Sequence, residues 1–257
     1  MTPTLPTSPT RGAELVALDL VKRYRAHVAL DVPALTVSAG ECVGLVGNNG
    51  AGKTTLLRLT LDLIRASSGH VALDGSPVEG RPAGRARVGA FLDASFLIDY
   101  LRPAEYFRFV GGAYGLSADE ADRRAAAFAD FLGPTVRAEP LLRDLSTGNA
   151  NKVGIVAAVL PRPALVVLDE PFANLDPGAR IGLEALIRAE TERGATVLVS
   201  SHDLDHVVDV CTRVLVLAGG RIVRDLPTTP ATLGELRAFF AGGGRDGVTP
   251  ARGRGAA

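Results

Sequence analysis

A glycine-rich stretch in the first quarter of the chain has residue types that bind phosphate. It fits the pattern G-x-x-x-x-G-K-[ST], in which Lys53 and Thr54 occupy the last two fixed positions. Its glycines let backbone N–H groups approach an anion, Lys53 supplies a charge for the β- and γ-phosphates, and Thr54 offers a hydroxyl to Mg²⁺. The residues predicted to bind phosphate are Gly47, Asn48, Asn49, Gly50, Ala51, Gly52, Lys53, Thr54 and Thr55.

Two adjacent acids, Asp169 and Glu170, follow an apolar run at residues 165–168. Asp169 can hold Mg²⁺ beside the Thr54 hydroxyl, directly or through water, and Glu170 can orient and deprotonate an attacking water. An apolar strand that leads into a polar loop is common, and it would give the same pattern without any chemistry. Because the phosphate loop occurs in the same chain, we interpret the two acids as the second half of a nucleotide-hydrolysing site.

The apolar pattern predicts the elements that position these residues. Strands are predicted at residues 14–20, 28–30, 35–37, 42–46, 70–73, 88–92, 165–169, 196–200, 214–217 and 221–226. Helices are predicted at residues 56–64, 177–193, 203–211 and 232–240. Strands that alternate with helices favour a parallel sheet, and sites in such sheets collect at the carboxyl ends of the strands. The expected fold class is therefore α/β, a P-loop nucleotide hydrolase with a parallel core sheet.

A helical block, at about residues 95–160, separates the phosphate loop from the two acids. Ser117 and Glu120 fit a helix-capping box within it. A short polar break at residues 145–149 precedes an apolar helical run at residues 153–160. The pattern therefore predicts an inserted helical subdomain.

Composition limits the classes of protein to which the chain can belong. It has 28 basic and 28 acidic residues, so no global field draws it to nucleic acid or to acidic lipid. Cys42 and Cys211 form no C-x-x-C pair, and we interpret them as buried thiols in a reducing cytosol. The apolar runs are shorter than the ~20 residues that a membrane helix needs. Residues 1–12, which lack the apolar segment of a secretory signal, and residues 242–257 are predicted disordered tails around a domain at residues 13–241.

The order of these motifs resembles that of the ATP-binding subunits of ABC transporters, over residues 15–226. Residues 145–149, Leu-Ser-Thr-Gly-Asn, are similar to the family signature Leu-Ser-Gly-Gly-Gln. Residues 173–176 are similar to its D-loop, and residues 199–202 to the segment that ends in its switch histidine. Tyr24 stands where the family stacks an aromatic ring on adenine, although it could be a plain loop aromatic. The resemblance implies an N-terminal antiparallel β subdomain and an inserted α-helical subdomain.

The resemblance also implies a mechanism, in which two subunits, identical or closely related, enclose ATP and Mg²⁺ head to tail. Glu170 is then the general base, and His202 binds the γ-phosphate together with the phosphate-loop lysine. Ser146, Gly148 and Asp176 contribute to the ATP held by the other subunit. The plain alternatives are a helix cap for Ser146 and a helix-terminal residue for His202. Such a subunit drives a separate integral membrane permease and is bound through it to the cytoplasmic face of the cell membrane.

Three positions depart from the family pattern. Asp93 stands where the family has a glutamine; it can meet Mg²⁺ through a water, but it cannot donate a hydrogen bond when ionised. Thr147 and Asn149 replace a glycine and the glutamine of the signature, whereas the two residues that touch phosphate are kept. Acidic residues at the glutamine position are familiar in subunits that pair with separate, export-type membrane proteins, so the resemblance favours export.

Some apolar residues near the start of the helical block are candidates for contact with the permease, although ordinary core packing explains each of them equally well. They are Phe91, Phe96, Leu97, Tyr100 and Leu101. The alternative function is a soluble ABC ATPase that acts on ribosomes or DNA. The chain has one ATPase half and no sustained heptad repeat, which disfavours that class. It also lacks the Asn-Lys-x-Asp segment that reads guanine.

Overall fold

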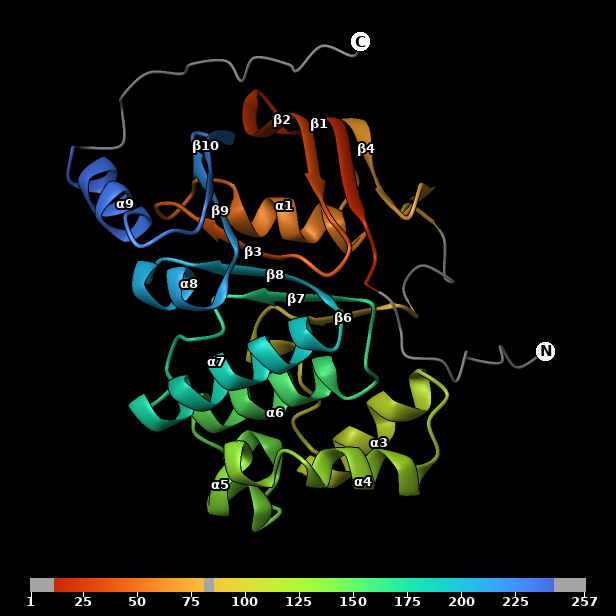
Figure 1. Cartoon of the computed structure of the whole chain (residues 1–257). Coiled ribbons are helices and arrows are strands. Elements are labelled where there is room, and N and C mark those ends of the chain that lie inside the picture. Colours follow the sequence, from red (N-terminus) through yellow and green to blue (C-terminus); the bar gives the residue numbers. More distant parts are fainter. Residues whose placement is uncertain (1–11, 81–85, 243–257) are drawn as a thin grey trace.

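The structure is a computed structural model that describes residues 12–80 and 86–242. Its first sheet is antiparallel and lies at the top of Figure 1, with the strand order β2-β1-β4-β5. Its strands are β1 (Leu15–Tyr24), β2 (His27–Val37), β4 (Ser68–Leu73) and β5 (Ser76–Pro77). The two predicted tails lie outside the described residues apart from Gly12 and Gly242.

The second sheet has the strand order β10-β9-β3-β8-β7-β6 and forms the centre of the molecule. Its strands are β3 (Cys42–Val46), β6 (Val88–Phe91), β7 (Leu165–Asp169), β8 (Thr196–Ser201), β9 (Arg213–Ala218) and β10 (Arg221–Pro227). Neighbouring strands from β9 to β6 are parallel, and only β10 pairs antiparallel, with β9. Every residue of β3, β7 and β8 is buried, as expected for parallel strands that are covered on both faces.

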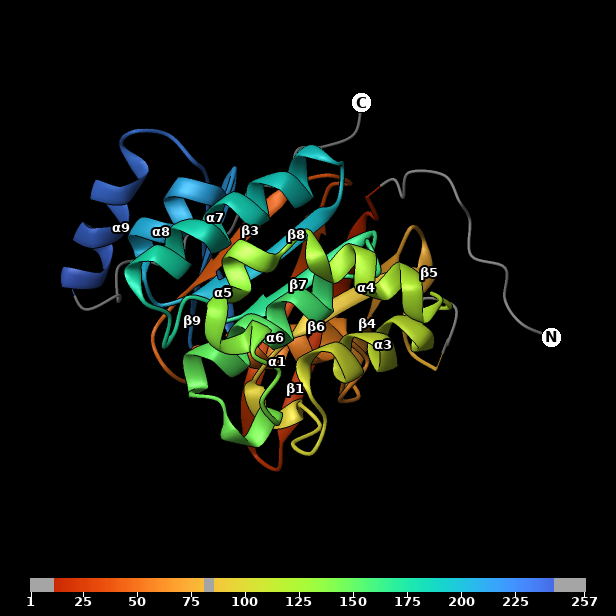
Figure 2. The ribbon, with the colours of Figure 1, turned by 90° about the horizontal axis from the view of Figure 1, so that it is seen from below.

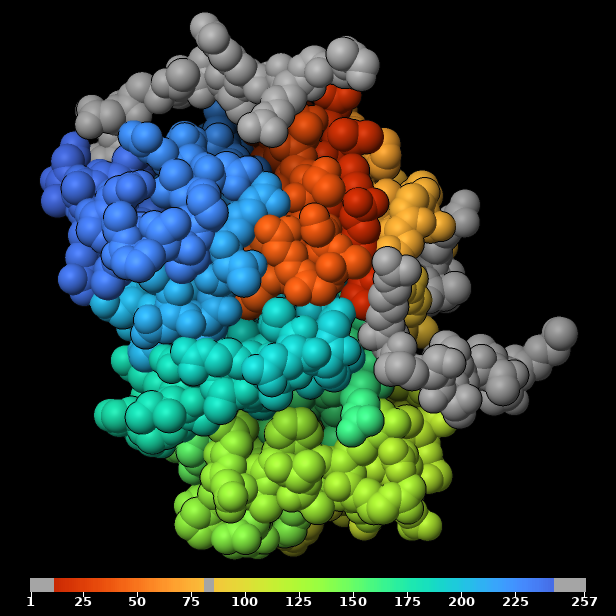
Figure 3. Space-filling model, in the orientation of Figure 1, coloured from red at the N-terminus to blue at the C-terminus, as the bar shows by residue number. Residues whose placement is uncertain are grey.

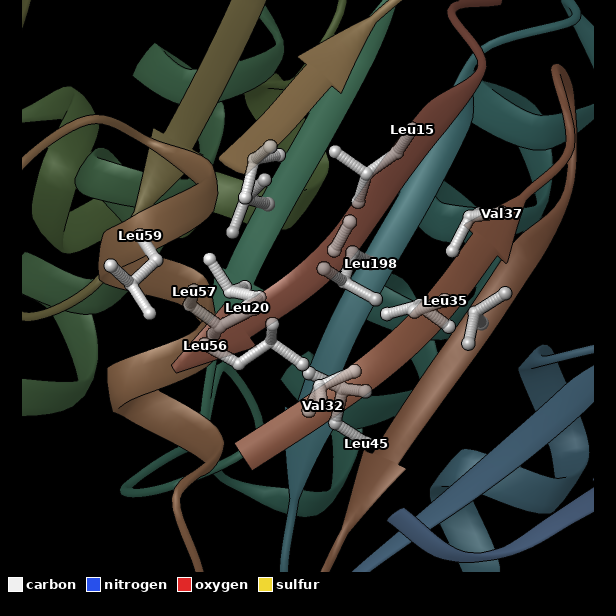
Figure 4. Close-up of a cluster of buried hydrophobic side chains, with 14 of the residues drawn as sticks. Leu15, Leu20, Val32, Leu35, Val37, Leu45, Leu56, Leu57, Leu59 and Leu198 are labelled. Atoms are coloured by element: carbon white, nitrogen blue, oxygen red, sulfur yellow. The ribbon is translucent and has the colours of Figure 1, made fainter. Parts of the chain in front are cut away.

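Two apolar layers cover this sheet. On one face, α1 (Lys53–Thr60) lies between the two sheets, and Leu15, Leu56 and Leu198 meet in the cluster drawn in Figure 4. On the other face lie α7 (Pro177–Glu192), α8 (Leu204–Val210) and α9 (Thr232–Ala241). The α/β architecture predicted from the sequence is confirmed.

The helical block forms a lobe at the opposite end of the molecule from the antiparallel sheet, drawn in green in Figure 3. It contains η1 (Ala94–Phe96), α3 (Pro103–Ala113), α4 (Ala118–Ala126), α5 (Ala129–Arg137), η2 (Leu142–Asp144) and α6 (Thr147–Val159). Figure 2 shows α3 to α6 gathered on one side of the central sheet, near β6 and β7. The lobe has its own apolar cluster, around Phe107, Val153 and Val156. Ser117 caps α4 by accepting the Glu120 N–H, as its sequence pattern predicts.

Several predicted element boundaries are wrong: the strand expected at residues 14–20, for example, is β1 and extends to Tyr24. Two others are wrong for local reasons. The two short strands expected at residues 28–30 and 35–37 are one strand, β2. It continues through Pro33 because β2 is an edge strand and its pairing with β1 skips the position beside Asp19, whose φ is 47°. The helix expected at residues 56–64 begins three residues earlier and ends at Thr60, close to Asp62, whose φ of 53° cannot continue a helix.

The cysteines Cys42 and Cys211 are buried and free, as predicted. Their Sγ atoms lie 3.6 Å apart, although 169 residues separate them in the chain. Cys42 begins β3, and Cys211 directly follows α8 as its C-cap, so the contact joins two elements that lead to and from the predicted site. Burial and the neighbouring thiol raise the pKa of Cys211 well above its ordinary value, with the Cys42 hydrogen bond as the larger cause. Cys211 therefore stays in the thiol form.

Candidate nucleotide site

The glycine-rich loop joins the carboxyl end of β3 to the start of α1. A Cβ at Gly47 would lie 2.4 Å from the Leu217 carbonyl oxygen, so the backbone passes here where no side chain fits. Gly52 precedes α1 with φ 109°, a conformation that favours glycine. The Lys53 ammonium donates a hydrogen bond to the Gly47 carbonyl, 2.7 Å away, which folds the lysine back across the loop. These features form a backbone-lined cradle of the kind that holds phosphate at a helix start.

The two acids lie at the carboxyl end of β7, beside β8. Strand pairing sets Asp169 directly opposite Ser200, and the buried Ser200 hydroxyl donates a hydrogen bond to Asp169 Oδ1. Glu170 has φ 47°, a strained value for a residue with a side chain. Its N–H is held by the Ser200 carbonyl oxygen at 3.1 Å and by Ser200 Oγ at 3.0 Å. Ser200 therefore orients one carboxylate and stabilises the backbone conformation that carries the other.

The carboxylate of Glu170 is the meeting point of the predicted motifs. Its Oε1 lies 3.4 Å from the Lys53 ammonium. Its Oε2 accepts the His202 N–H at 3.1 Å and lies 2.8 Å from His202 Nδ1. The side chain of Glu170 is 29% exposed and that of Lys53 only 7%, so the group is partly shielded from water and open on one side. A carboxylate in this setting can take a proton from a water molecule placed between it and a phosphate.

The signature and the D-loop form a second cluster at the start of α6. Ser146 caps this helix by accepting the Asn149 N–H, and a Cβ on Gly148 would lie 2.4 Å from the Asn174 carbonyl oxygen. Lys152 Nζ lies 3.5 Å from Asp176 Oδ2. Among residues 12–80 and 86–242, none of the recorded hydrogen bonds or ion pairs joins this cluster to the phosphate loop.

Asp176 also begins α7, where its side chain accepts the Ala179 N–H at 2.9 Å. This hydrogen bond, and after it the charge of Lys152, lower the pKa of Asp176 below its ordinary value. The carboxylate is thus ionised at neutral pH and forms the fixed start of α7.

The contacts of Tyr24 and Asp93 in the structure are local, and neither residue takes part in the hydrogen bonds and ion pairs described for Glu170. Tyr24 ends β1 with 48% of its surface exposed, and the Lys22 ammonium lies 4.9 Å from the centre of its ring. Asp93 caps η1, and its Oδ1 accepts the Ser95 N–H at 2.6 Å. The described part of the chain contains no cluster of three or more His, Cys, Asp or Glu residues that could hold a metal by itself.

Sequence reasoning assigned no individual role to three residues that organise these clusters. Ser200 lies inside an apolar strand, and a polar residue in such a run is the signal that could have marked it. Asn174 has φ 62°, which asparagine tolerates better than most residues. Lys152 is one of three lysines in a chain that otherwise uses arginine, and its side chain is 12% exposed.

The fold and the site together define the class of protein to which the chain belongs. A parallel sheet with a phosphate loop after β3 and paired acids after β7 is the arrangement of a P-loop nucleotide-binding protein. Among the described helices, none is both long and apolar enough to cross a membrane.

Comparison with known proteins identifies the family. The ABC transporter family matches residues 30–173, more than half of the chain. An ABC transporter ATP-binding protein of Synechocystis is 35% identical over 74% of this chain and 54% of its own length. The Nod factor export ATP-binding protein I of Cupriavidus metallidurans is 34% identical over 79% of this chain and 68% of its own length. A solved ATP-binding subunit of an ABC transporter, 29% identical, superposes with a TM-score of 0.76 and covers 88% of this chain and 93% of that one.

The chain belongs to the ABC transporter family, and the resemblance inferred from its motifs is confirmed. It spans between about half and two thirds of the length of the two curated relatives named above.

Proposed function

We propose that this chain is the ATP-hydrolysing subunit of an ABC transporter, which dimerises around ATP and drives a separate transmembrane permease. The observation that carries this proposal is the Glu170 carboxylate, held between Lys53 and His202 at the mouth of the phosphate loop. Glu170 acts as the general base on water, while Lys53 and His202 bind the γ-phosphate. Tyr24, at the exposed end of β1, stacks on the adenine ring.

Mg²⁺ fits the residues that the sequence assigns to it. Asp169 is 6% exposed and engages Ser200 through Oδ1, which leaves Oδ2 for a cation. The Thr54 hydroxyl, this carboxylate oxygen, phosphate oxygens and water are the hard ligands that Mg²⁺ prefers. Asp93 uses Oδ1 to cap η1, so its proposed contact with the ion, through a water, falls to Oδ2. The ion would neutralise phosphate charge in the transition state.

The second ATPase subunit supplies the other half of each site. Ser146 is exposed at the start of α6, where a hydroxyl and the positive end of the helix dipole suit a phosphate. Gly148 and the exposed Asp176 lie in the same cluster. Because these residues bind no group of their own phosphate loop, we assign them to the nucleotide of the facing subunit. The sequence leaves open whether that subunit is a second copy or a relative.

The permease docks beside the helical lobe in this proposal. An apolar cavity of about 310 Å³ lies between the end of α1, β6 and the lobe, with Phe96, Leu97 and Asp93 in its lining. Phe96 is 61% exposed and Tyr100 is 73% exposed, which suits contact with another chain. Phe91 is 5% exposed and belongs to the core. Docking there would hold the chain at the cytoplasmic face of the membrane.

Export is the direction that we propose. The relative from Cupriavidus metallidurans is named for export of Nod factor, and Asp93 takes the place of glutamine, as in export-type subunits. The balanced charge of the chain gives no support to nucleic acid as a partner. An ABC ATPase that acts on ribosomes or DNA is the competing function, which the test below separates.

The Glu170→Gln variant tests the proposed function. It should bind ATP, lose hydrolysis by at least about 100-fold because the general base is gone, and accumulate as a closed dimer. Tagged variant is incubated with detergent-solubilised native membranes, with and without ATP, and its partners are identified. The matched control is Glu192→Gln, an exposed glutamate at the end of α7.

Co-recovery of a polytopic membrane protein in near-equal amount supports the proposal. Recovery of ribosomes or DNA without such a protein contradicts the transporter role. Hydrolysis by Glu170→Gln at the parent rate contradicts the assignment of the base.

A further inference from the structure

His206 lies in α8, one helical turn beyond His202, and packs against a segment that carries the catalytic acids. Its ring stacks on that of Phe172, with centroids 4.6 Å apart and planes 9° from parallel. Phe172 is 2% exposed and follows Glu170 by two positions. The imidazole therefore rests on the turn that holds the proposed general base.

Both ring nitrogens of His206 face carboxylates from different elements. Nδ1 lies 2.7 Å from Glu184 Oε1, on α7, and Nε2 lies 3.6 Å from Asp203 Oδ2. Asp203 adjoins His202 in the chain and begins α8. The side chains of His206 and Glu184 are 19% and 14% exposed, so these interactions are partly shielded from water.

Two guanidinium groups complete the surroundings of His206. Arg188 approaches the other oxygen of Glu184 at 3.9 Å, and Arg180 approaches Asp203 Oδ2 at 3.8 Å. Arg180 also donates a hydrogen bond to the Leu175 carbonyl, at 3.1 Å, inside the D-loop. The cluster thus connects the D-loop, α7, the turn after Glu170 and the switch-histidine segment.

We propose that His206 is a positioning residue for hydrolysis, which ties the switch-histidine segment to α7 and to the turn after Glu170 so that His202 meets the Glu170 carboxylate. His202 is itself 68% exposed, so its orientation depends on the backbone around it and on Glu170. Loss of the contacts that His206 makes with Phe172, Glu184 and Asp203 leaves the phosphate loop intact and misplaces His202. This inference rests on the proposed ATP hydrolysis.

A purely structural role for His206 makes a different prediction. Packing alone would change the thermal midpoint, and activity would fall only with the folded fraction. A positioning role lowers kcat in fully folded protein and spares the KM for ATP, because Lys53 and Tyr24 lie on elements outside the cluster. The ratio of these two constants therefore separates the two roles.

The experiment compares four variants of the purified full chain. His206→Phe keeps the stacked ring and removes both polar contacts, and Glu184→Ala removes the partner of Nδ1. Glu184→Gln keeps an oxygen that accepts the Nδ1–H, and serves as the conservative variant. His70→Phe makes the same substitution at an exposed position of β4 and serves as the control for replacing a histidine by phenylalanine.

We expect kcat to fall about 10-fold in His206→Phe and Glu184→Ala, with KM within about twofold of the parent. Glu184→Gln should keep kcat within about threefold, and His70→Phe should match the parent. Each assay is run well below the thermal midpoint of the variant, so that the folded fraction is close to one.

A folded His206→Phe with parental kcat would overturn the positioning role, as would a rise in KM with kcat unchanged. Equal losses in Glu184→Gln and Glu184→Ala would also overturn it, since the hydrogen bond would then be irrelevant. A parent chain that hydrolyses no ATP overturns the proposed function itself, and this outcome is recognised before any variant is compared.

Discussion

The two functional clusters of this chain differ in where their partners lie. Around Glu170, the functional groups contact one another: Lys53 and His202 both reach its carboxylate. Around α6, Ser146 and Asp176 are exposed; each caps a helix, and Asp176 also pairs with Lys152 of the same cluster. The first cluster is therefore assembled by one chain, whereas the contacts described for the second stay within it, which is consistent with the shared site that we propose.

The difference has a structural cause. Phosphate loop, acids and switch histidine follow neighbouring strands of one parallel sheet, and strand register brings their ends together. The signature belongs to the helical lobe, which has its own apolar cluster. The lobe packs on the sheet through Ile155, Ala158 and Val159 of α6. If each site is divided between these two regions of facing subunits, as we propose, changes in the two clusters should complement each other between subunits.

The largest expected loss of ATP hydrolysis comes from two variants, each with a substitution in a different one of the two clusters. Lys53→Ala removes the phosphate-loop charge, and Gly148→Ala forces a Cβ against the Asn174 carbonyl, which displaces the signature. Each variant alone should lose nearly all hydrolysis. If the chain forms homodimers, a one-to-one mixture should recover roughly a quarter of the parent rate, because half the dimers are mixed and each mixed dimer has one intact site.

To measure this complementation, the rate of phosphate release by the mixture is compared with the rate of each variant alone. The variants are first shown to fold by circular dichroism. A mixture no more active than its components would mean that the sites are not shared between copies of this chain.

A smaller loss should follow removal of the Ser200 hydroxyl. Ser200→Ala takes one hydrogen bond from Asp169 and one from the strained Glu170 backbone, so we expect hydrolysis to fall about 10-fold. Ser200→Thr keeps the hydroxyl and should retain most of the rate. ATP binding, followed by equilibrium titration, should change little in Ser200→Ala. Equal rates for the alanine and threonine variants would show that the hydroxyl does not position the acids.

The smallest effect should come from Lys152, in the exposed cluster. Lys152→Met removes the ion pair with Asp176 and should lower hydrolysis by about threefold or less, since the Asp176 carboxylate is largely exposed and water screens the pair. The pKa of Asp176, followed by NMR titration, should rise but stay below its ordinary value, because the Ala179 N–H is the larger cause of its depression. A pKa that returns fully to its ordinary value would make Lys152 the dominant partner.

The lowered pKa of Asp176 also determines how the stability of the folded state changes with pH. A carboxyl group whose pKa is lowered by folding stabilises the native state above its unfolded pKa. That contribution is lost as pH falls through the lower, folded pKa of Asp176. In Lys152→Met the folded pKa of Asp176 should be higher, so this contribution should be smaller and its loss complete at a higher pH, which acid denaturation curves of parent and variant can detect.

Much of the site could be predicted from sequence because its motifs are local. The strand, the glycine-rich loop and the start of α1 follow one another without a break, and Asp169 ends β7 with Glu170 directly after it. Residue type and spacing therefore determined the phosphate loop, the paired acids and the α/β class. The motif order determined the family.

Only the tertiary structure decided which of these residues touch. Asp169 meets Ser200 because β7 and β8 pair in one register, and that register also carries His202 to Glu170. Sequence patterns do not report register, so Ser200 and the tie through His206 were not predicted. Cys42 and Cys211 meet for the same reason: contacts between elements far apart in the chain depend on how sheets and helices pack, which no local spacing encodes.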